Sequence, residues 1–209
     1  LKKRSWHGEN DREEALFSEP DIVPLVPDFV SGGNEEYKGA ARGTAYHRLM
    51  ECLDYTAVDS ESQIHKQITA LTEAKKMAYE EAQCIRIQDI MTFLHSEIGQ
   101  RMKKAFEADQ LYREQPFVLA QSMKNIEKDW NGEETVLVQG IIDAYFIEDE
   151  EIVLVDYKTD RVRKGEEQHL IDLYHTQLED YAQALERMLQ KKVKETCIYS
   201  FTLGKMIPV

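Results

Sequence analysis

Two neighbouring strand-like runs constrain the fold of this chain more than any other part of its sequence. Residues 135–147 (TVLVQGIIDAYFI) and 151–159 (EIVLVDYKT) are rich in the β-branched and aromatic side chains that favour strands. The polar stretch from Glu148 to Glu151 separates them. A hairpin that turns symmetrically about the centre of this stretch pairs these two glutamates and makes the strands antiparallel.

The register of this hairpin predicts that acidic side chains meet. Continued pairing places Asp143 opposite Asp156, and the Cβ atoms of such cross-strand neighbours lie about 4.5–5.5 Å apart. Two like charges at that distance destabilise the pair unless a cation neutralises them. Because side chains alternate along a strand, Lys158 shares a face with Asp156, whereas Val155 and Tyr157 point to the other face.

Two carboxylates with a lysine beside them fit phosphate chemistry. Carboxylates hold Mg²⁺, which prefers oxygen ligands and keeps several waters. The ion can polarise a phosphoryl oxygen and acidify a bound water, while a lysine steadies the developing charge or orients the nucleophile. The spacing alone leaves a second interpretation open, a surface hairpin whose aspartates are merely solvated. One extra residue in the loop would also turn one carboxylate to the opposite face.

The rest of the chain predicts helices before this hairpin and a helix and a strand after it. Residues 1–35 mix charges with prolines and lack sustained periodicity, so we expect a linker or docking arm. From Gly43 to Glu107 apolar residues recur at helical spacing, notably over 60–83 and 86–107. We expect further strands at LYREQPFVLA (111–120) and VKETCIYSFTL (193–203), with a helix at 169–190 between the hairpin and the last strand. This order predicts an α/β or α+β architecture, a mixed sheet covered by helices.

The composition is that of a globular protein. Of 209 residues, 42% are hydrophobic and 31% charged, which argues against a largely disordered chain. The length fits one domain with a full core, which we expect over residues 36–209. The formal net charge of −13 is unusual for a nucleic-acid enzyme, because phosphate contacts normally come from Lys and Arg.

Several other classes of protein are disfavoured. No stretch approaches the roughly 18 consecutive apolar residues of a membrane span, and the opening LKKRSWHGEN lacks the apolar run of a secretory signal. We therefore expect a cytoplasmic protein without membrane contact. The cysteines are far apart and never in a CxxC spacing, so neither a disulfide framework nor a zinc ribbon is expected: Cys52, Cys84 and Cys197.

Short motifs follow one another along the chain: GTAYH (ending in His47), REQPF (containing Glu114), GIID (ending in Asp143), DYKT (with Asp156 and Lys158) and QLEDY (with Gln177 and Tyr181). In this order they resemble the RecB-like nuclease domains of the PD-(D/E)XK superfamily. The similarity is greatest to the C-terminal domain of the AddA subunits of AddAB (RexAB) helicase-nucleases, and it runs from about Gly43 to the last residue. It implies a restriction-endonuclease-like α/β core with a helical N-terminal part.

The resemblance implies a role for each matching residue. His47, Asp143 and Asp156 would bind the metal, helped by the main-chain carbonyl of Tyr157, and Lys158 would be the catalytic lysine. The expected ion is Mg²⁺, with Mn²⁺ also accepted because imidazole is a softer ligand than Mg²⁺ prefers.

Two further positions are less defined. Gln177 and Tyr181 match the QxxxY motif of the family, thought to serve the active site or the DNA strand; their spacing equally permits ordinary packing of the Tyr ring. Glu114 begins or precedes a strand, where it is either a supporting residue of the site or an exposed glutamate.

The implied function is that of a DNA exonuclease within a larger machine. The chain would hydrolyse single-stranded DNA from unwound duplex ends, on the 3′-ended strand, in double-strand-break repair and recombination. Because no GxxxxGK[ST] phosphate loop is present, helicase and ATPase activity are expected only in a full-length protein, with an AddB/RexB-type partner subunit. The scattered cysteines predict no iron–sulfur cluster. The alternatives are a catalytically inactive nuclease-like module and a stand-alone RecB-like exonuclease.

Overall fold

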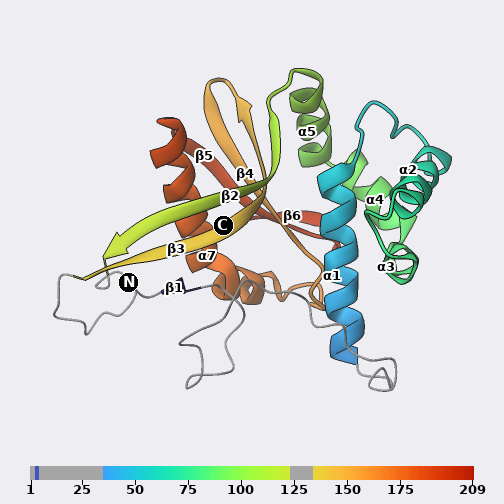
Figure 1. The fold of residues 1–209 in the computed structure, drawn as a ribbon, viewed down its shortest axis with the longest axis horizontal. Coiled ribbons are helices and arrows are strands. Elements are labelled where there is room, and N and C mark those ends of the chain that lie inside the picture. Colours follow the sequence, from blue (N-terminus) through green and yellow to red (C-terminus); the bar gives the residue numbers. More distant parts are fainter. Residues whose placement is uncertain (1–2, 5–34, 123–133) are drawn as a thin grey trace.

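A computed structural model describes residues 3–4, 35–122 and 134–209 (Figure 1). Most of the predicted linker or docking arm at 1–35 lies outside these residues. Within that arm, Lys3 and Arg4 form a short strand and Glu35 begins the first helix. Among the helices of the described residues, none is both long and apolar enough to cross a membrane.

One mixed sheet forms the centre of the described part of the chain. Its strand order is β1-β3-β4-β5-β6, with β2 paired to β3; β4–β5 and β1–β3 are parallel and the other pairs antiparallel. The predicted strands at 111–120 and in the hairpin are confirmed. The last one ends at Ser200, and a turn leads to an additional short strand that was not predicted, because four residues are too few to show an alternating pattern. The strands are β1 (Lys3–Arg4), β2 (Leu111–Ser122), β3 (Thr135–Glu148), β4 (Glu151–Lys158), β5 (Val193–Ser200) and β6 (Lys205–Pro208).

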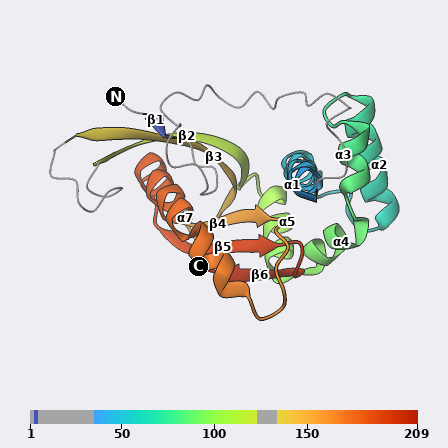
Figure 2. The same ribbon diagram turned by 90° about the horizontal axis from the view of Figure 1, so that it is seen from below.

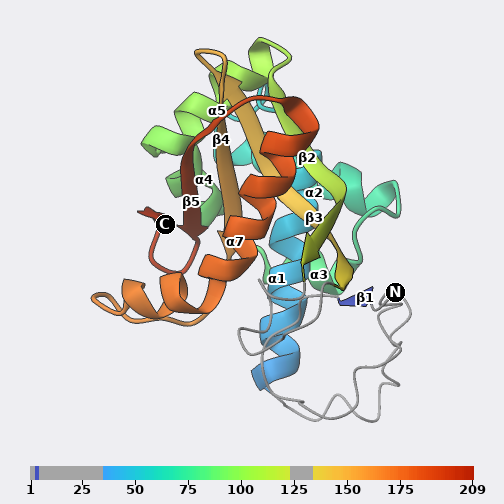
Figure 3. The ribbon, with the colours of Figure 1, turned by 90° about the vertical axis from the view of Figure 1, so that its left-hand side faces the viewer.

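Helices cover both faces of this sheet, as predicted for an α/β core. Helix α7 lies across one face and the N-terminal helices lie behind the strands in Figure 3. The first helix begins at Glu35, earlier than the predicted Gly43. The helices are α1 (Glu35–Cys52), α2 (Glu61–Glu73), α3 (Tyr79–Cys84), α4 (Ile87–His95), α5 (Glu97–Glu107) and α7 (Glu167–Leu189).

The periodic stretch 86–107 is two helices because the chain bends sharply at Ser96. The Ser96 hydroxyl donates to the carbonyl of Phe93 and accepts from the N–H of Gly99 at 3.2 Å, so it ends α4 and caps α5. A Cβ at position 99 would lie 2.0 Å from the Phe93 carbonyl oxygen, so only glycine fits this bend. The close approach lets α4 and α5 pack on the same side of the sheet.

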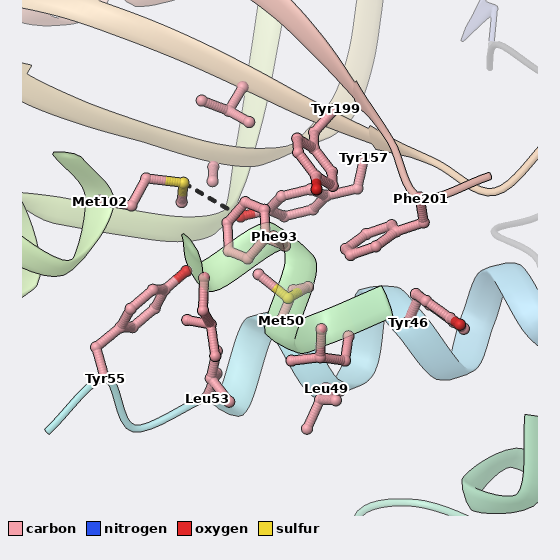
Figure 4. Packing of buried hydrophobic residues seen from close by; sticks show 14 of the residues in the cluster. Tyr46, Leu49, Met50, Leu53, Tyr55, Phe93, Met102, Tyr157, Tyr199 and Phe201 are labelled. Atoms are coloured by element: carbon pink, nitrogen blue, oxygen red, sulfur yellow. Dashed lines mark hydrogen bonds between the residues drawn. The ribbon is translucent and has the colours of Figure 1, made fainter. Parts of the chain in front are cut away.

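Two hydrophobic clusters hold the layers together. The larger cluster packs the helices from α1 through α5 on one face of the sheet. Figure 4 shows its aromatic centre, where Phe93, Tyr157, Tyr199 and Phe201 pack against residues of α1. The Tyr157 hydroxyl donates to the sulfur of Met102 at 3.7 Å. The smaller cluster packs α7 on the other face. The sheet is therefore the middle layer of a three-layer core, which Figure 2 shows along a second direction.

The hairpin of β3 and β4 turns where it was predicted to turn. Glu148 pairs with Glu151, and the central residues Asp149 and Glu150 both have positive φ angles, 53° and 66°. Such angles at both central positions are typical of a two-residue type I′ turn, whose twist matches that of the flanking strands. The pairing continues without a shift.

Beyond Ala144 and Val155 the two strands separate. Strand β4 stays in the sheet beside β5, whereas β3 continues with β2 as an arm, drawn at the left of Figure 1, on which the short β1 also pairs with β3. We call the point of separation the fork. Asp143 and Asp156 are the first residues beyond the last pair. The predicted carboxylates therefore lie where the sheet divides.

Candidate active site

Two of the predicted metal ligands, His47 and Asp143, meet at the main chain of Tyr157 in β4. Its N–H donates a hydrogen bond to Asp143 Oδ2 at 2.8 Å, and its carbonyl oxygen lies 3.0 Å from His47 Nε2. His47 Nδ1 in turn lies 3.2 Å from Asp143 Oδ1. Helix α1 and strands β3 and β4 thus bring three residues that are distant in sequence to one point.

His47 and Asp143 stabilise each other's charged forms. Burial by itself lowers the pKa of the His47 imidazole, but the Asp143 carboxylate offsets this and raises that pKa to about 9. Burial by itself raises the pKa of the Asp143 carboxyl, yet the charge of His47 and its hydrogen bond hold that pKa below its usual value. Without an added ion, an imidazolium thus neutralises the buried carboxylate.

Asp156 and Lys158 form the second charged pair of the site. Lys158 Nζ lies 2.8 Å from Asp156 Oδ2, and the side chains are 13% and 2% exposed. Burial raises the pKa of the Asp156 carboxyl to about 6, although Lys158 acts in the opposite direction. Burial lowers the pKa of the Lys158 ammonium, but Asp156 and Asp143 more than offset this and raise it. As predicted, Tyr157 points instead to the other face, into the core.

Glu114 lies inside β2, so the prediction that it begins or precedes a strand was wrong. Its backbone has a positive φ of 49°, and the ladder to β3 resumes on either side in the same register, which places Glu114 opposite Asp143. Burial and the charge of Asp143 raise the pKa of the Glu114 carboxyl to about 7. One ligand atom each from His47, Glu114 and Asp143 lies within 4.8 Å of the others.

This set of atoms fits a divalent cation. The metal–oxygen distances of Mg²⁺ are about 2.0–2.1 Å, so adjacent ligands of its octahedral shell lie about 3 Å apart. His47 can offer one ring nitrogen to the ion, and the separation of its Nδ1 from Asp143 Oδ1, 3.2 Å, matches that value. The Tyr157 carbonyl oxygen lies beside the other nitrogen, Nε2, at 3.0 Å. Two carboxylates, a carbonyl and an imidazole are ligands that Mg²⁺ and Mn²⁺ share.

Gln177 and Tyr181 face each other on α7, as their spacing predicted. Gln177 Nε2 donates to the Tyr181 hydroxyl at 2.6 Å, and the Tyr181 ring packs edge-on against Phe117 at 5.2 Å. Burial, and after it the carboxylates of Asp156 and Asp143, raise the pKa of the Tyr181 hydroxyl. The pair therefore lies within electrostatic reach of the fork.

A cavity of about 620 Å³ opens beside these residues, between the N-terminal half of α1 and the end of β4. His47 and Lys158 are among its lining residues, together with Arg42 and Arg161. Arg42 also bonds to the Thr159 carbonyl at 3.2 Å and pairs with Asp89 at 3.3 Å, which ties α1 to the segment after β4. One member of each charged pair, His47 and Lys158, thus lines the cavity.

Residues 26–206 of this sequence match the sequence profile of the PD-(D/E)XK nuclease superfamily. The chain belongs to that superfamily. The resemblance inferred from the order of the motifs is thereby confirmed, as is the α/β core expected from it. In this chain, residues of the GTAYH, GIID and DYKT motifs lie together at the fork.

The chain is also similar to proteins that are named as subunits of ATP-dependent helicase/nucleases. The protein of Clostridium perfringens is 34% identical over 204 residues, which cover 95% of this chain and 16% of the relative. The protein of Alkaliphilus metalliredigens is 38% identical over 204 residues, which cover 94% of this chain and 17% of the relative. The chain thus spans about a sixth of the length of these relatives.

The sequence motifs did not include every residue that contacts the charged pairs. Tyr174 of α7 lies with its ring centroid 4.0 Å from Lys158 Nζ, and its hydroxyl donates to Asp160 Oδ1 at 3.0 Å. Its position, three residues before Gln177 and seven before Tyr181, is the signal that places it on the same helix face.

Proposed function

We propose that this chain is the nuclease module of an ATP-dependent helicase-nuclease and hydrolyses phosphodiester bonds of DNA. The observation that carries the proposal is the convergence of His47 and Asp143 on the main chain of Tyr157 at the fork, between the paired residues Asp156 and Lys158. These residues come from three different motifs, and packing alone does not require a lysine and two aspartates to be buried together.

His47, Asp143, Asp156 and the Tyr157 carbonyl would hold one divalent cation, Mg²⁺ or Mn²⁺, with Glu114 close enough to support it. A bound cation supplies a polarised phosphoryl oxygen and an acidified water. Lys158 keeps its proton at neutral pH, because its pKa is raised, so its ammonium can donate to a non-bridging phosphate oxygen as charge develops there.

The substrate would reach this centre through the cavity along α1. Arg42, Lys158 and Arg161 are among its lining residues, so the cavity carries cationic groups within an otherwise acidic chain. We propose single-stranded DNA from an unwound duplex end, cut on its 3′-ended strand during double-strand-break repair and recombination. In the full-length protein, motor domains and an AddB/RexB-type partner subunit would deliver the strand, so the chain itself needs no strongly basic surface.

The direct test is cleavage of labelled single-stranded DNA by the purified chain with Mg²⁺ or Mn²⁺. We expect Asp143→Asn to reduce the cleavage rate at least about 100-fold, because a cation ligand is lost. We expect Lys158→Ala to reduce the cleavage rate about 100- to 1,000-fold, because a donor that stabilises the developing charge is lost. Lys194→Ala is a matched control, since that lysine pairs with Glu148 at the far end of the hairpin.

The outcomes separate the candidate functions. Binding of DNA without cleavage under all metal conditions would favour a catalytically inactive nuclease-like module. Cleavage that both Asp143→Asn and Lys158→Ala retain would show that the fork is not the active site. Cleavage of DNA by the full-length protein only when ATP is hydrolysed would tie the module to a motor, whereas ATP-independent cutting would favour a stand-alone exonuclease.

A further inference from the structure

We propose that Tyr174 is a positioning residue that holds the Lys158 ammonium at the fork through the face of its aromatic ring. No motif of the sequence includes this tyrosine, and its ring lies against the lysine of the site rather than a predicted metal ligand. The proposal rests on the proposed function in one respect, namely that Lys158 acts on the substrate.

The geometry gives Lys158 two partners on different sides. Asp156 Oδ2 lies 2.8 Å from the ammonium nitrogen, and the centroid of the Tyr174 ring lies 4.0 Å from it. A cation within about 6 Å of a ring centroid is attracted by the negative face of the ring, and more so where water is excluded. With only 13% of the Lys158 side chain exposed, the contact is largely desolvated.

An aromatic face suits a catalytic lysine for a chemical reason. A second carboxylate in that position would occupy N–H donors of the ammonium, whereas a ring attracts the charge as a whole. When Asp156 is also engaged by a cation, its attraction for Lys158 is shared. The Tyr174 ring then remains as a partner that keeps the ammonium in place and leaves its donors for a phosphate oxygen.

The ring is itself fixed from two directions. Helix α7 presents Tyr174 on the same face as Gln177 and Tyr181, and the Tyr174 hydroxyl donates to Asp160 Oδ1 at 3.0 Å. Asp160 follows β4 by two residues, so this bond connects the helix to the chain just after Lys158. The helix and the strand end therefore hold the ring over the ammonium together.

A direct readout of this contact needs no catalysis. In the NMR spectrum of the chain labelled with ¹³C-lysine, the Hε protons of Lys158 should shift upfield because they lie over the ring. The shift should persist in Tyr174→Phe and disappear in Tyr174→Leu, which keeps apolar bulk but has no ring. An unshifted Lys158 signal in the parent chain would overturn the proposal, whether or not the chain cuts DNA.

The kinetic readout separates a ring effect from ordinary packing. Phenylalanines with increasing fluorination at position 174 keep the shape of the ring and weaken its negative face. We expect kcat to fall stepwise along this series and to fall about 2- to 30-fold in Tyr174→Leu, with KM and Mn²⁺ affinity unchanged. Tyr174→Trp should retain activity, since an indole face attracts cations most strongly.

Controls distinguish failure of this inference from failure of the proposed function. Tyr112→Leu removes a ring that stacks on Tyr145 at 4.8 Å and faces no lysine of the described residues, and it should leave kcat unchanged. If Lys158→Ala abolishes cleavage while the fluorinated series stays flat, the proposed function stands and the positioning role of Tyr174 is wrong. If Lys158→Ala cuts normally, the proposed function fails at this residue.

Discussion

At the scale of single residues, Gly140 shows how closely the motif residues are packed. It opens the GIID motif on β3, and a Cβ there would lie 2.8 Å from Cε1 of Phe117 and 3.6 Å from Cε1 of Tyr181. Phe117 and Tyr181 pack edge to face at 5.2 Å, so neither ring can withdraw without disturbing the other. The absence of a side chain at Gly140 thus lets α7 bring Tyr181 and Gln177 close to the fork.

We expect Gly140→Ala to lower the free energy of unfolding by about 1–3 kcal/mol, the usual cost of overpacking a dense core. Urea unfolding followed by circular dichroism measures this value. Gly39→Ala is a matched control, because nothing lies within 4 Å of the added Cβ and alanine favours the helix. Equal stability of the two variants would contradict the close packing around Gly140.

Residue identities could be predicted from the motifs, but their contacts could not. The hairpin register placed Asp143 near Asp156 because pairing in a two-residue hairpin is fixed by the turn. The contact of Tyr174 with Lys158 depends on how α7 crosses the sheet, and the role of Glu114 depends on one positive φ angle. Neither has a local signature in the sequence.

At the scale of elements, one arginine connects α5 to two strands. Arg101 donates to both carboxylate oxygens of Glu148 at 3.0 and 2.8 Å and to Glu195 at 2.7 Å, and its guanidinium stacks on Phe146. The bidentate pair is of the kind that contributes measurably even near the surface. It fixes the helical layer to the end of the hairpin opposite the fork.

This pair predicts a pH dependence of stability. Hydrogen bonds from Arg101 lower the pKa of the Glu148 carboxyl to about 2, although burial has a smaller effect in the opposite direction. Since the pKa in the unfolded chain is about 4.3, the contribution is complete above that pH and is lost as the pH falls toward 2. We expect Glu148→Gln to be less stable than the parent by about 1–2 kcal/mol at pH 7, a moderate value because the pair is partly solvated.

The difference should shrink when the pH is lowered from 5 to 2.5, as measured by urea unfolding at each pH. Glu151→Gln is the control. It removes the same charge from the neighbouring strand, and Glu151 forms no ion pair with any of the described residues. A difference that stays constant with pH would show that Arg101 does not stabilise the Glu148 carboxylate.

The main elements could also be predicted, with failures where the signal is short. The long strands and α7 have strong periodic patterns, and these were confirmed. Strand β6 has only four residues, and the division of 86–107 depends on the cap at Ser96 and the close approach at Gly99. These features depend on tertiary contacts, which periodicity does not report.

At the scale of the whole molecule, the site joins three parts of the fold, namely the two hydrophobic clusters and the sheet between them. The larger cluster holds α1 with its His47, the smaller cluster holds α7, and the sheet between them carries the carboxylates. A cation at the fork would therefore connect α1 to β3 and β4, and its binding free energy would add to the stability of the fold.

We expect Mn²⁺ to raise the Tm of the parent chain. At a free concentration 100 times the Kd, binding adds about 2.7 kcal/mol, which corresponds to about 5–10 °C for a chain of this size. Asp143→Asn should show no such shift, and Lys194→Ala should shift like the parent. Scanning calorimetry measures these shifts. If neither Mn²⁺ nor Mg²⁺ changes the Tm of the parent chain, these residues do not form a metal centre.

The fork has one more consequence, which concerns aggregation. Past Val155, β4 has no strand beside it on the β3 side in the described part of the chain, so its peptide groups there form an open sheet edge, the kind of surface on which a second chain can add a strand. The carboxylate of Asp143 and the ring of His47 occupy the N–H and the carbonyl of Tyr157 and so block that edge. The side chains proposed to bind a cation thus also occupy main-chain groups with which a second chain could otherwise pair. Variants that remove them should be checked for oligomers before a loss of cleavage is attributed to the missing metal ligand.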